Sequence, residues 1–247
     1  VGSLVTPVTM YYPGLLARRL ATLDHITGGR LVFGVGCGWY PKEFTGYGYQ
    51  FDSLKVRAQK MLEALEVIRA LWTKEGPVTY HGKYYHLEEA EALLKPAQKP
   101  HPPIWIGGIS RRLLEMTAKY GQGWIPYEVP PDMLREKLRT LKELTKKYDR
   151  TLSDIELVNA FRSIVTYDPE EAKREMERIH IDPATHEEVD MWGVRSRIIV
   201  GSPEDCVRQL KEYLSLGIRG FVVSIQPPWK TLEGLRIYAE HVLPNLT

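Results

Sequence analysis

The sequence predicts an α/β protein with parallel strands, built either as a (β/α) barrel or as a doubly wound sheet. Strand-like and helix-like segments alternate along nearly the whole chain of 247 residues. The opening reads strand, helix, strand, an order that joins parallel strands in one sheet. The length suits a single barrel. We expect one domain over 1–247, because no flexible linker, low-complexity tract or internal repeat divides the chain.

The first elements are predicted from apolar runs and from residues that stop helices. Residues Val1–Val8 are apolar apart from small and hydroxyl side chains, which is typical of a buried parallel strand. Leucines recur at helical spacing after Pro13, and Gly28 and Gly29 end that helix. The branched and aromatic run Leu31–Val35 then predicts a second buried strand.

Later elements follow the same rules. Asp52 is expected to cap a long helix that ends at the Gly-Pro pair 76–77, and Gly82 is expected at the turn of a hairpin over 78–87. Ser202 and Asp205 have the spacing of a capping box, which starts a further helix. The other predicted strands are 104–106, 124–127, 155–165 and 221–225, and the other predicted helices are 110–121, 131–144, 170–178 and 232–242.

Two stretches are expected to be less regular. An irregular polar and aromatic insertion lies around 37–52, and a less regular segment lies around 168–200, where residues 182–197 show no clear period. Six strands in all suit a parallel sheet.

Composition argues against several classes of partner. The net charge of +2 and the lack of a basic cluster argue against nucleic acid. No apolar run approaches a membrane span and there is no signal peptide, so we expect a cytoplasmic protein without a membrane partner. The two cysteines lie far apart in the sequence, which favours a reducing compartment and no zinc site. Scarce Asn beside plentiful Lys, Arg and Glu indicates a thermophilic source.

The stretch GGRLVFGVGCGWYPKEF contains the first candidate site. A predicted strand runs into Gly36, Cys37 and Gly38, and two aromatics, Trp39 and Tyr40, follow. Glycines let the backbone approach a ligand and present its N–H groups, and aromatic rings can wall a flat ring system. The alternative, equally weighted, is a tight loop whose aromatics pack into the core.

The stretch IWIGGIS contains the second candidate. A strand ends at Ile106, Gly107 and Gly108 follow, and Ser110 stands where a helix begins. Free N–H groups at a helix start favour a phosphate. The plainer alternative, a βα turn with a serine cap, is favoured on this motif alone. Two glycine-rich strand ends in one parallel sheet together strengthen the case for a ligand site, because the carboxyl ends of parallel strands share one face.

The remaining candidate residues give little indication of a catalytic or metal site. None of the 7 histidines lies at a predicted strand end, so we expect neither a metal ligand nor a catalytic base among them. The G-x-S-x-G motif of serine hydrolases is absent. Asp24 and Arg30 flank the stop of the first helix, where we expect an ion pair.

Several stretches of the sequence, taken together and in order, resemble a known family. The run LATLDHITGGRLVFGVGCGW, followed by a long helix ending in ALW, is similar to the luciferase-like oxidoreductases, and the likeness is weakest between Asp182 and Ser196. It continues through LLKPAQKPHPPIWIGG, YGQGWIPY and VGSPEDCVRQLKEYLSLGIRGFVV. The resemblance implies a TIM-like (β/α)8 barrel, a homodimer, and FMN or the deazaflavin coenzyme F420 bound across the mouth formed by the strand ends.

The resemblance also implies cofactor-binding positions. Val5 and Thr6 match the end of the family's third strand, where a bulge, often with a non-prolyl cis peptide, supports the ring. Gly36, Cys37 and Gly38 match the loop that approaches the cofactor from the next strand. Some relatives have arginine in place of Cys37, so phosphate binding here would rely more on backbone N–H groups. The catalytic residues stay unassigned.

The phosphate-binding turn of the family matches Gly107, Gly108, Ile109 and Ser110. If backbone N–H groups of this turn hold the phosphate, Gly108→Val should weaken cofactor binding more than it lowers the thermal stability of the cofactor-free protein.

Compared with the family, the chain lacks the first two βα units, which usually supply polar residues on the substrate side. Six visible strands plus two such units make the eight of the barrel. We therefore expect Val1–Val8 to be an interior strand whose second neighbour, and part of the active site, is encoded upstream.

The resulting expectation is an oxidoreductase acting on a small organic substrate. With FMN the reaction would be monooxygenation with O₂, in some cases with a flavin reductase as partner, and with F420 it would be hydride transfer. Two alternatives stay open: a non-catalytic flavin-binding protein, and a phosphate-binding barrel enzyme of another class. The second of these would need a Lys or Glu at a strand end.

Overall fold

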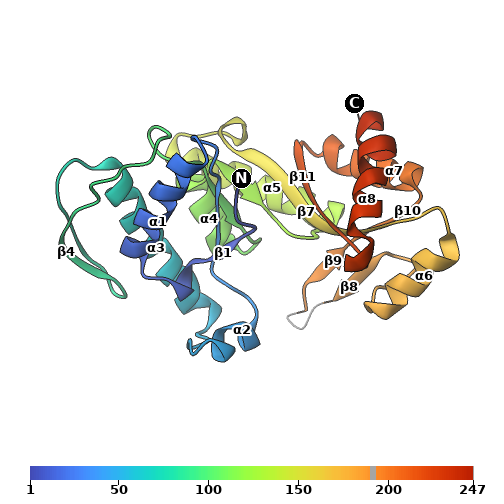
Figure 1. Cartoon of the computed structure of the whole chain (residues 1–247), viewed down its shortest axis with the longest axis horizontal. Coiled ribbons are helices and arrows are strands. Elements are labelled where there is room, and N and C mark those ends of the chain that lie inside the picture. Colours follow the sequence, from blue (N-terminus) through green and yellow to red (C-terminus); the bar gives the residue numbers. More distant parts are fainter. Residues whose placement is uncertain (190–192, 247) are drawn as a thin grey trace. The chain divides into compact units, whose positions relative to one another are not determined.

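The computed structural model describes residues 1–189 and 193–246, and the chain divides into two compact units (Figure 1). The first unit comprises Val1–Trp124 and Leu144–Ile155, and the second comprises Ile125–Glu143 and Glu156–Thr247. Within the described ranges, no helix has the length and apolar character needed to cross a membrane. The single domain expected over 1–247 stays a prediction.

Neighbouring strands of the first unit lie in the order β1 (Thr6–Pro7), β2 (Phe33–Gly36), β5 (Ile104–Gly107) and β6 (Gly123–Ile125). The pairs β1–β2 and β2–β5 are parallel, as predicted. The first strand is much shorter than expected, because residues 1–5 form only an isolated bridge, between Gly2 and Val32. Pro7 has no N–H to continue the ladder, and Val8–Met10 turns into a 3-10 helix. Only β2 pairs with β1 among the described strands, so an interior position for β1 stays a prediction.

Helices cover the sheet of the first unit: α1 (Pro13–Ile26), α2 (Pro41–Gly46), α3 (Leu54–Thr73) and α4 (Arg111–Tyr120). The core packs α1 and α3 against β2 and β5, and the Trp72 indole donates to the Ala17 carbonyl at 2.9 Å. Ser53, and not Asp52, caps α3, because its Oγ accepts from the N–H of Val56 at 3.4 Å. The predicted hairpin is confirmed as β3 (Val78–His81) and β4 (His86–Ala90).

In the second unit, β7 (Glu156–Val165) pairs in parallel with β11 (Gly220–Ile225) and, at its end, with β10 (Ile199–Gly201). The sequence did not predict β10, because three residues are too short for a periodic signal. The capping box is confirmed, since Ser202 and Asp205 bond reciprocally at the start of α7. The helices here are α5 (Pro131–Thr145), α6 (Pro169–Arg178), α7 (Pro203–Ser215) and α8 (Thr231–Ile237), which continues as a π-helical turn over Tyr238–Val242.

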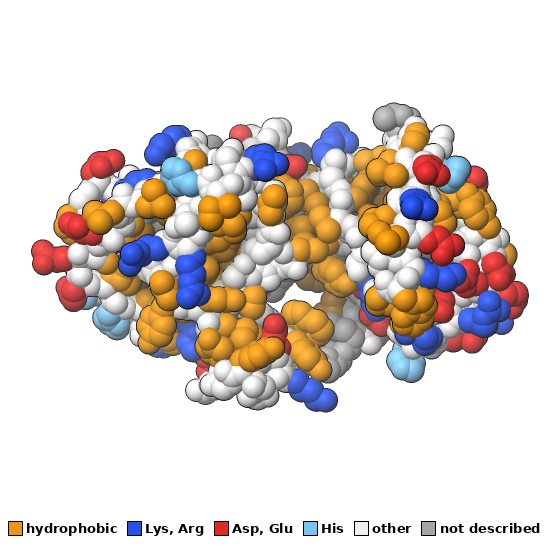
Figure 2. All heavy atoms as spheres, in the orientation of Figure 1, with side chains coloured by type: hydrophobic (Ala, Val, Ile, Leu, Met, Phe, Trp, Pro, Cys, Tyr) orange, Lys and Arg blue, Asp and Glu red, His pale blue; other side chains and the backbone are white. Residues whose placement is uncertain are grey.

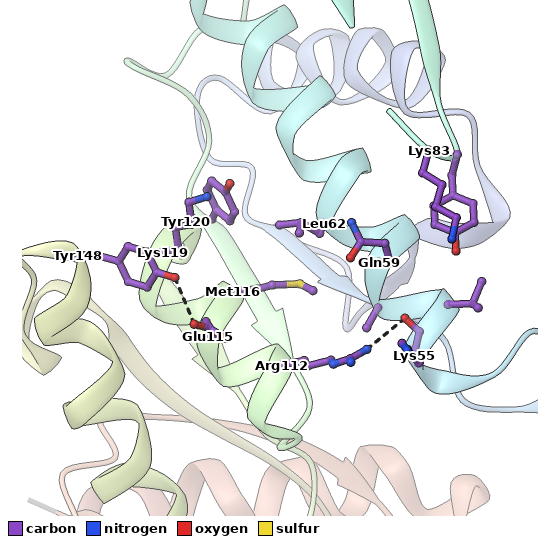
Figure 3. Close-up of a pocket in the computed structure, with 13 residues that line it drawn as sticks. Lys55, Gln59, Leu62, Lys83, Arg112, Glu115, Met116, Lys119, Tyr120 and Tyr148 are labelled. Atoms are coloured by element: carbon purple, nitrogen blue, oxygen red, sulfur yellow. Dashed lines mark hydrogen bonds between the residues drawn. The ribbon is translucent and has the colours of Figure 1, made fainter. Parts of the chain in front are cut away.

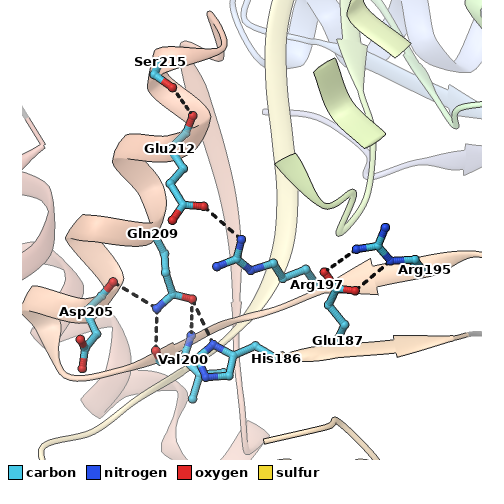
Figure 4. A network of polar contacts seen from close by, with 9 residues as sticks. All are labelled: His186, Glu187, Arg195, Arg197, Val200, Asp205, Gln209, Glu212 and Ser215. Carbon is cyan, nitrogen blue, oxygen red and sulfur yellow. Dashed lines mark hydrogen bonds and ion pairs between the residues drawn. The ribbon is translucent and has the colours of Figure 1, made fainter. Parts of the chain in front are cut away.

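The segment without a clear period contains a small antiparallel hairpin, β8 (Glu187–Val189) and β9 (Arg195–Arg197), and residues 190–192 lie outside the described ranges. Polar contacts tie this region to α7 (Figure 4). His186, next to β8, donates from its Nδ1 to the side-chain oxygen of Gln209 at 3.3 Å, and Arg197 of β9 donates to Glu212 at 3.0 Å. The hairpin is thus held by side-chain contacts rather than by an apolar stripe, which explains its weak sequence signal.

Candidate cofactor site

The nine predicted site residues lie at the ends of three neighbouring strands of the first unit. Thr6 pairs with Val35 and Val35 pairs with Ile106, so the chain leaves β1, β2 and β5 at the same edge of the sheet. Parallel strands place their carboxyl ends on one face, where α/β proteins bind ligands. The structure therefore brings the predicted positions together, and their contact with a cofactor stays a prediction.

The end of β1 fits closely against β2. The Leu4–Val5 peptide bond is cis, as the resemblance implies for this strand. Ser3 Oγ donates to the Gly34 carbonyl at 2.7 Å, and Thr6 Oγ1 donates to Ser3 Oγ at 2.8 Å. A Cβ on Gly36 would lie 2.8 Å from a Val5 methyl group. Gly36 is thus required by packing between the strands, whatever it contacts on its other side.

The turn after β2 exposes its aromatics. Gly38 has φ +77° and a Cβ there would lie 2.4 Å from the Phe44 ring, so only glycine fits. Trp39 is 65% exposed and its ring centroid lies 5.4 Å from that of Tyr40. The alternative that these two aromatics pack into the core is wrong. Phe44, in α2, is the aromatic of this stretch that is buried.

The turn after β5 has the predicted helix cap. Ser110 Oγ accepts from the N–H of Leu113 at 3.4 Å, and the Trp124 indole donates to the Gly108 carbonyl at 2.9 Å. Gly108 has φ +106°, and a Cβ there would lie 2.5 Å from Leu113 Cδ1. Gly108→Val is therefore expected to lower the stability of the cofactor-free protein as well, because a side chain at this position strains the backbone and meets Leu113. Ser110 is the cleaner position for testing a phosphate site.

Arg57, in the first turn of α3, is a candidate site residue that sequence reasoning missed. Its side chain is only 6% exposed, yet its Nε has no hydrogen-bond partner among the described residues. One Nη donates to the Asp52 carbonyl, and the guanidinium lies 4.0 Å from the centroid of the Phe51 ring. A buried cation with an unused donor is costly unless an anion joins it. Arg57 therefore suits the phosphate of a cofactor.

A signal for Arg57 was present in the sequence. Arg57, Met61, Ala64 and Ile68 recur at helical spacing, so a cation stands on the apolar stripe of α3. Arg57 also faces the Cys37 thiol, where its charge opposes part of the rise in pKa that burial imposes. The neighbouring helix α3 thus places a positive charge beside Cys37.

Both cysteines are expected to be unreactive in the native protein. Burial raises the pKa of Cys37, and it raises that of Cys206 to about 12, so both thiols stay protonated near pH 8. Ellman's reagent should find neither thiol in the folded protein and both after denaturation. Fast reaction of one native thiol at pH 8 would contradict this assignment.

The ion pair expected between Asp24 and Arg30 is wrong. Asp24 is fully buried and accepts from the Gln98 backbone N–H at 2.8 Å and from its side-chain amide at 2.7 Å. Arg30 instead donates to the Thr27 carbonyl at 2.8 Å. Asp24 thus anchors the proline-rich segment that precedes β5. Among the described residues, no group of three or more His, Cys, Asp or Glu side chains could hold a metal ion.

Comparison with known proteins agrees with this geometry. A family model described as luciferase-like monooxygenase matches residues 1–220. The F420-dependent glucose-6-phosphate dehydrogenase of Microbacterium testaceum (strain StLB037) is 30% identical over 266 residues, which cover 99% of this chain and 77% of the relative.

Solved structures share the fold. An F420-dependent secondary alcohol dehydrogenase, in complex with an F420-acetone adduct, superposes with a TM-score of 0.84 at 21% identity. The match covers 100% of this chain and 79% of the dehydrogenase chain. The oxygenating constituent of 3,6-diketocamphane monooxygenase from Pseudomonas putida, in complex with FMN, gives a TM-score of 0.74 at 18% identity, with coverages of 100% and 79%. These similarities confirm the predicted TIM-like α/β fold.

Proposed function

We propose that this chain, which belongs to the luciferase-like monooxygenase family, uses coenzyme F420 and transfers a hydride between it and an alcohol carbon of a small substrate. Membership makes the chain a luciferase-like oxidoreductase, an enzyme that works with F420 or FMN. The choice of F420 rests on one observation: the curated relative that is 30% identical over 99% of this chain is F420-dependent. The alcohol rests on the names of the same relative and of the structural neighbour that acts on secondary alcohols.

The residues at the strand ends suit such a cofactor. FMN and F420 share a flat three-ring system, a ribityl chain and a phosphate. We assign the phosphate to the backbone N–H groups of the turn after β5, to Ser110 Oγ and to the unused Nε of Arg57. We assign the flat ring to the ends of β1 and β2, at Val5, Thr6 and residues 36–38, where the chain packs tightly and keeps its shape.

The protein's own contribution is placement and shielding. The bound coenzyme supplies the hydride chemistry, and the chain holds it in one orientation. Packing between Val5 and Gly36 fixes the strand ends under the ring, so little order is lost when the cofactor binds. The exposed rings of Trp39 and Tyr40 are free to close over the ring and exclude water.

Titration with both cofactors tests the proposal. We expect F420 to bind with a shift of its absorbance and fluorescence, and FMN to bind more weakly. Reduction of F420 at its absorbance band should then follow addition of glucose 6-phosphate or a secondary alcohol under anaerobic conditions. Tight binding of FMN without binding of F420, together with O₂-dependent substrate oxidation, would instead support the monooxygenase reaction.

Ser110→Gly separates phosphate binding from stability. Glycine is nearly as good a helix cap as serine, so the free energy of unfolding should fall by only a few tenths of a kcal/mol. Loss of a hydroxyl that donates to a phosphate should raise the dissociation constant for the cofactor about tenfold, from a hydrogen bond of about 1.5 kcal/mol. Ser110→Ala should weaken binding equally but cost about 1 kcal/mol of stability. Unchanged cofactor affinity in both variants would remove Ser110 from the phosphate site.

The homodimer, the cytoplasmic location and the thermophilic source implied earlier belong to this proposal. Large hydrophobic side chains reach the surface on both units, which supports self-association (Figure 2). Exposed examples in the first unit are Tyr12, Leu15 and Ile26. A monomer mass by light scattering at working concentration would contradict the dimer. Hydride transfer from an alcohol to F420 requires no flavin reductase, so that partner belongs only to the alternative reaction with FMN.

A further inference from the structure

The strands of the second unit have one face that the C-terminal helix covers and one that it leaves open. On the covered face, the Tyr238 hydroxyl of the π-helical turn donates to Ser163 Oγ of β7 at 2.7 Å. Arg162, the neighbour of Ser163, points to the opposite face, because side chains alternate along a strand. Helices cover the outside of a TIM-like barrel, so Arg162 belongs to the inner face.

The strand register brings three polar side chains together on this inner face. Tyr127, two residues after β6, pairs in parallel with Ala160, which lies two residues before Arg162 in β7. Ser224, near the end of β11, pairs directly with Arg162. Residues paired across a sheet point to the same face, and barrel enzymes build their active sites from the carboxyl ends of several strands. We call Tyr127, Arg162 and Ser224 the inner-face trio.

Two carboxylates more than balance the charge of Arg162. Glu128 accepts from its Nε and from its Nη2 at 2.6 Å each, and Glu188 of β8 accepts from Nη2 at 2.5 Å. One cation against two carboxylates leaves one net negative charge beside the trio. Lys230, which follows β11, is likewise held by Glu171. A phosphate group brought to this face would therefore be repelled.

The inner-face trio combines free polar groups with apolar surface. The Arg162 side chain is 20% exposed, and its Nη1 donates to no described residue. Its two carboxylate partners fix the guanidinium, so Nη1 can donate to a ligand oxygen at little cost in entropy. Ser224 is exposed and the Tyr127 ring is 52% exposed. Ala160 and Val222, paired on the same face, add apolar surface next to them.

We infer that the inner-face trio binds the substrate, and that this substrate is an uncharged secondary alcohol with an apolar body rather than a phosphorylated one. The inference rests on the proposed function, which leaves both kinds of alcohol open. Arg162 Nη1 and the Ser224 hydroxyl donate to the alcohol oxygen, and the carbonyl oxygen of the product accepts from the same donors. The apolar carbons of the substrate lie on Ala160, Val222 and the Tyr127 ring.

Anaerobic kinetics with three alcohols test the preference. Cyclohexanol, glucose and glucose 6-phosphate are compared at low ionic strength, with the loss of F420 absorbance as the readout. We expect kcat/KM for cyclohexanol to exceed that for glucose 6-phosphate about tenfold or more, because the phosphate is repelled. Glucose, which lacks only the phosphate, should also be the better substrate of the two sugars. Salt should raise kcat/KM for glucose 6-phosphate alone, because it screens the repulsion. A kcat/KM for glucose 6-phosphate that equals or exceeds that for cyclohexanol would overturn the inference.

A charge variant locates the repulsion. Glu188→Gln removes the net negative charge and leaves the pair of Arg162 with Glu128 intact, so kcat/KM for glucose 6-phosphate should rise about fivefold. The matched control is Glu187→Gln. Glu187 is the preceding residue of β8, points to the opposite face and pairs with Arg195 at 2.9 Å. No gain from Glu188→Gln, or an equal gain from Glu187→Gln, would refute repulsion at this face.

Tyr127→Ala tests the contact with substrate without any hydride transfer. Saturation-transfer NMR measures the binding of cyclohexanol to the protein. We expect its dissociation constant to rise about tenfold, because the ring contact is lost, while the affinity for F420 stays unchanged. The matched control is Tyr167→Ala. Tyr167 follows β7 and is 62% exposed, but its ring contacts His241 of the C-terminal helix, with centroids 6.4 Å apart. Unchanged binding of cyclohexanol to Tyr127→Ala would remove Tyr127 from the substrate site.

Binding and turnover are measured separately, so this inference and the proposed function fail on different results. If F420 is reduced by glucose 6-phosphate and not by cyclohexanol, the function stands and the inference fails. If no alcohol reduces F420 but cyclohexanol binds through Tyr127, the inner-face trio stands as an alcohol site and the proposed function fails. If cyclohexanol shows no saturation transfer, the inference fails whatever the coenzyme does.

Discussion

Replacing Arg57 with methionine is expected to raise the dissociation constant of the cofactor about 10- to 100-fold. A hydrogen bond to a charged group contributes about 1.5–3 kcal/mol, which corresponds to this range. Arg57 is 6% exposed and has an unused Nε, so the side chain is already held in place and its charge is poorly solvated. Isothermal titration with F420 measures the change.

The cofactor-free Arg57→Met protein should keep its stability to within about 1 kcal/mol. It loses the bond to the Asp52 carbonyl and the contact with Phe51, but it also loses a buried charge without a carboxylate partner. Arg69→Met is the matched control: its Nε is also buried without a partner, it lies on the same helix, and its guanidinium stacks on Tyr120 at 4.9 Å. The phosphate assignment is wrong if both variants bind the cofactor like the parent protein.

Glu128→Gln is expected to cost about 2–3 kcal/mol of unfolding free energy, and thus to lower Tm by about 5–10 °C. Glu128 is 1% exposed, and its carboxylate accepts from the side chain of Arg162 at 2.6 Å through both oxygens and from the Arg162 N–H at 2.9 Å. Glutamine keeps the shape and suits the φ of +53° no worse. It leaves Arg162 with Glu188 as its acidic partner, at 2.5 Å.

Glu212→Gln provides the comparison within the same unit. Glu212 accepts from Arg197 at 3.0 Å (Figure 4), but its side chain is 45% exposed. Exposed pairs contribute little, so this variant should change the unfolding free energy by less than about 0.5 kcal/mol. Thermal unfolding of the two variants, measured side by side, tests whether burial makes the Glu128 pair contribute more stability than the Glu212 pair. Equal losses of unfolding free energy in both variants would refute this explanation.

The sequence determined the parallel α/β fold and most of its elements. Periodic apolar residues, caps and glycine stops predicted β2, β5 and the helices α1, α3, α4, α5 and α7, because core burial imposes those periods on the chain. The short helix α2 (Pro41–Gly46) lies in the stretch that the sequence predicted to be irregular. The same strand ends carried the predicted cofactor positions, because glycines after parallel strands let the backbone approach a ligand at the face where such proteins bind it. The prediction of FMN or F420 as cofactor came from the resemblance to the luciferase-like family, because the spacing of apolar residues carries no information about a cofactor.

The tertiary structure alone decided the features that depend on residues far apart in the chain. Asp24 bonds to Gln98 and not to Arg30, because the proline-rich segment folds back over the end of α1. Arg57 lies beside Cys37 because α3 packs against the turn after β2, and this neighbourhood leaves no local pattern in the sequence beyond a cation on an apolar stripe. The cations Lys55, Lys83, Arg112 and Lys119 line one groove between α3 and α4, and they come together only when two helices and a hairpin pack (Figure 3). Burial in the core imposes a regular spacing of apolar residues on each element, so the sequence alone shows where helices and strands lie. The residues of a site come from several elements, and only the packing of those elements brings them together.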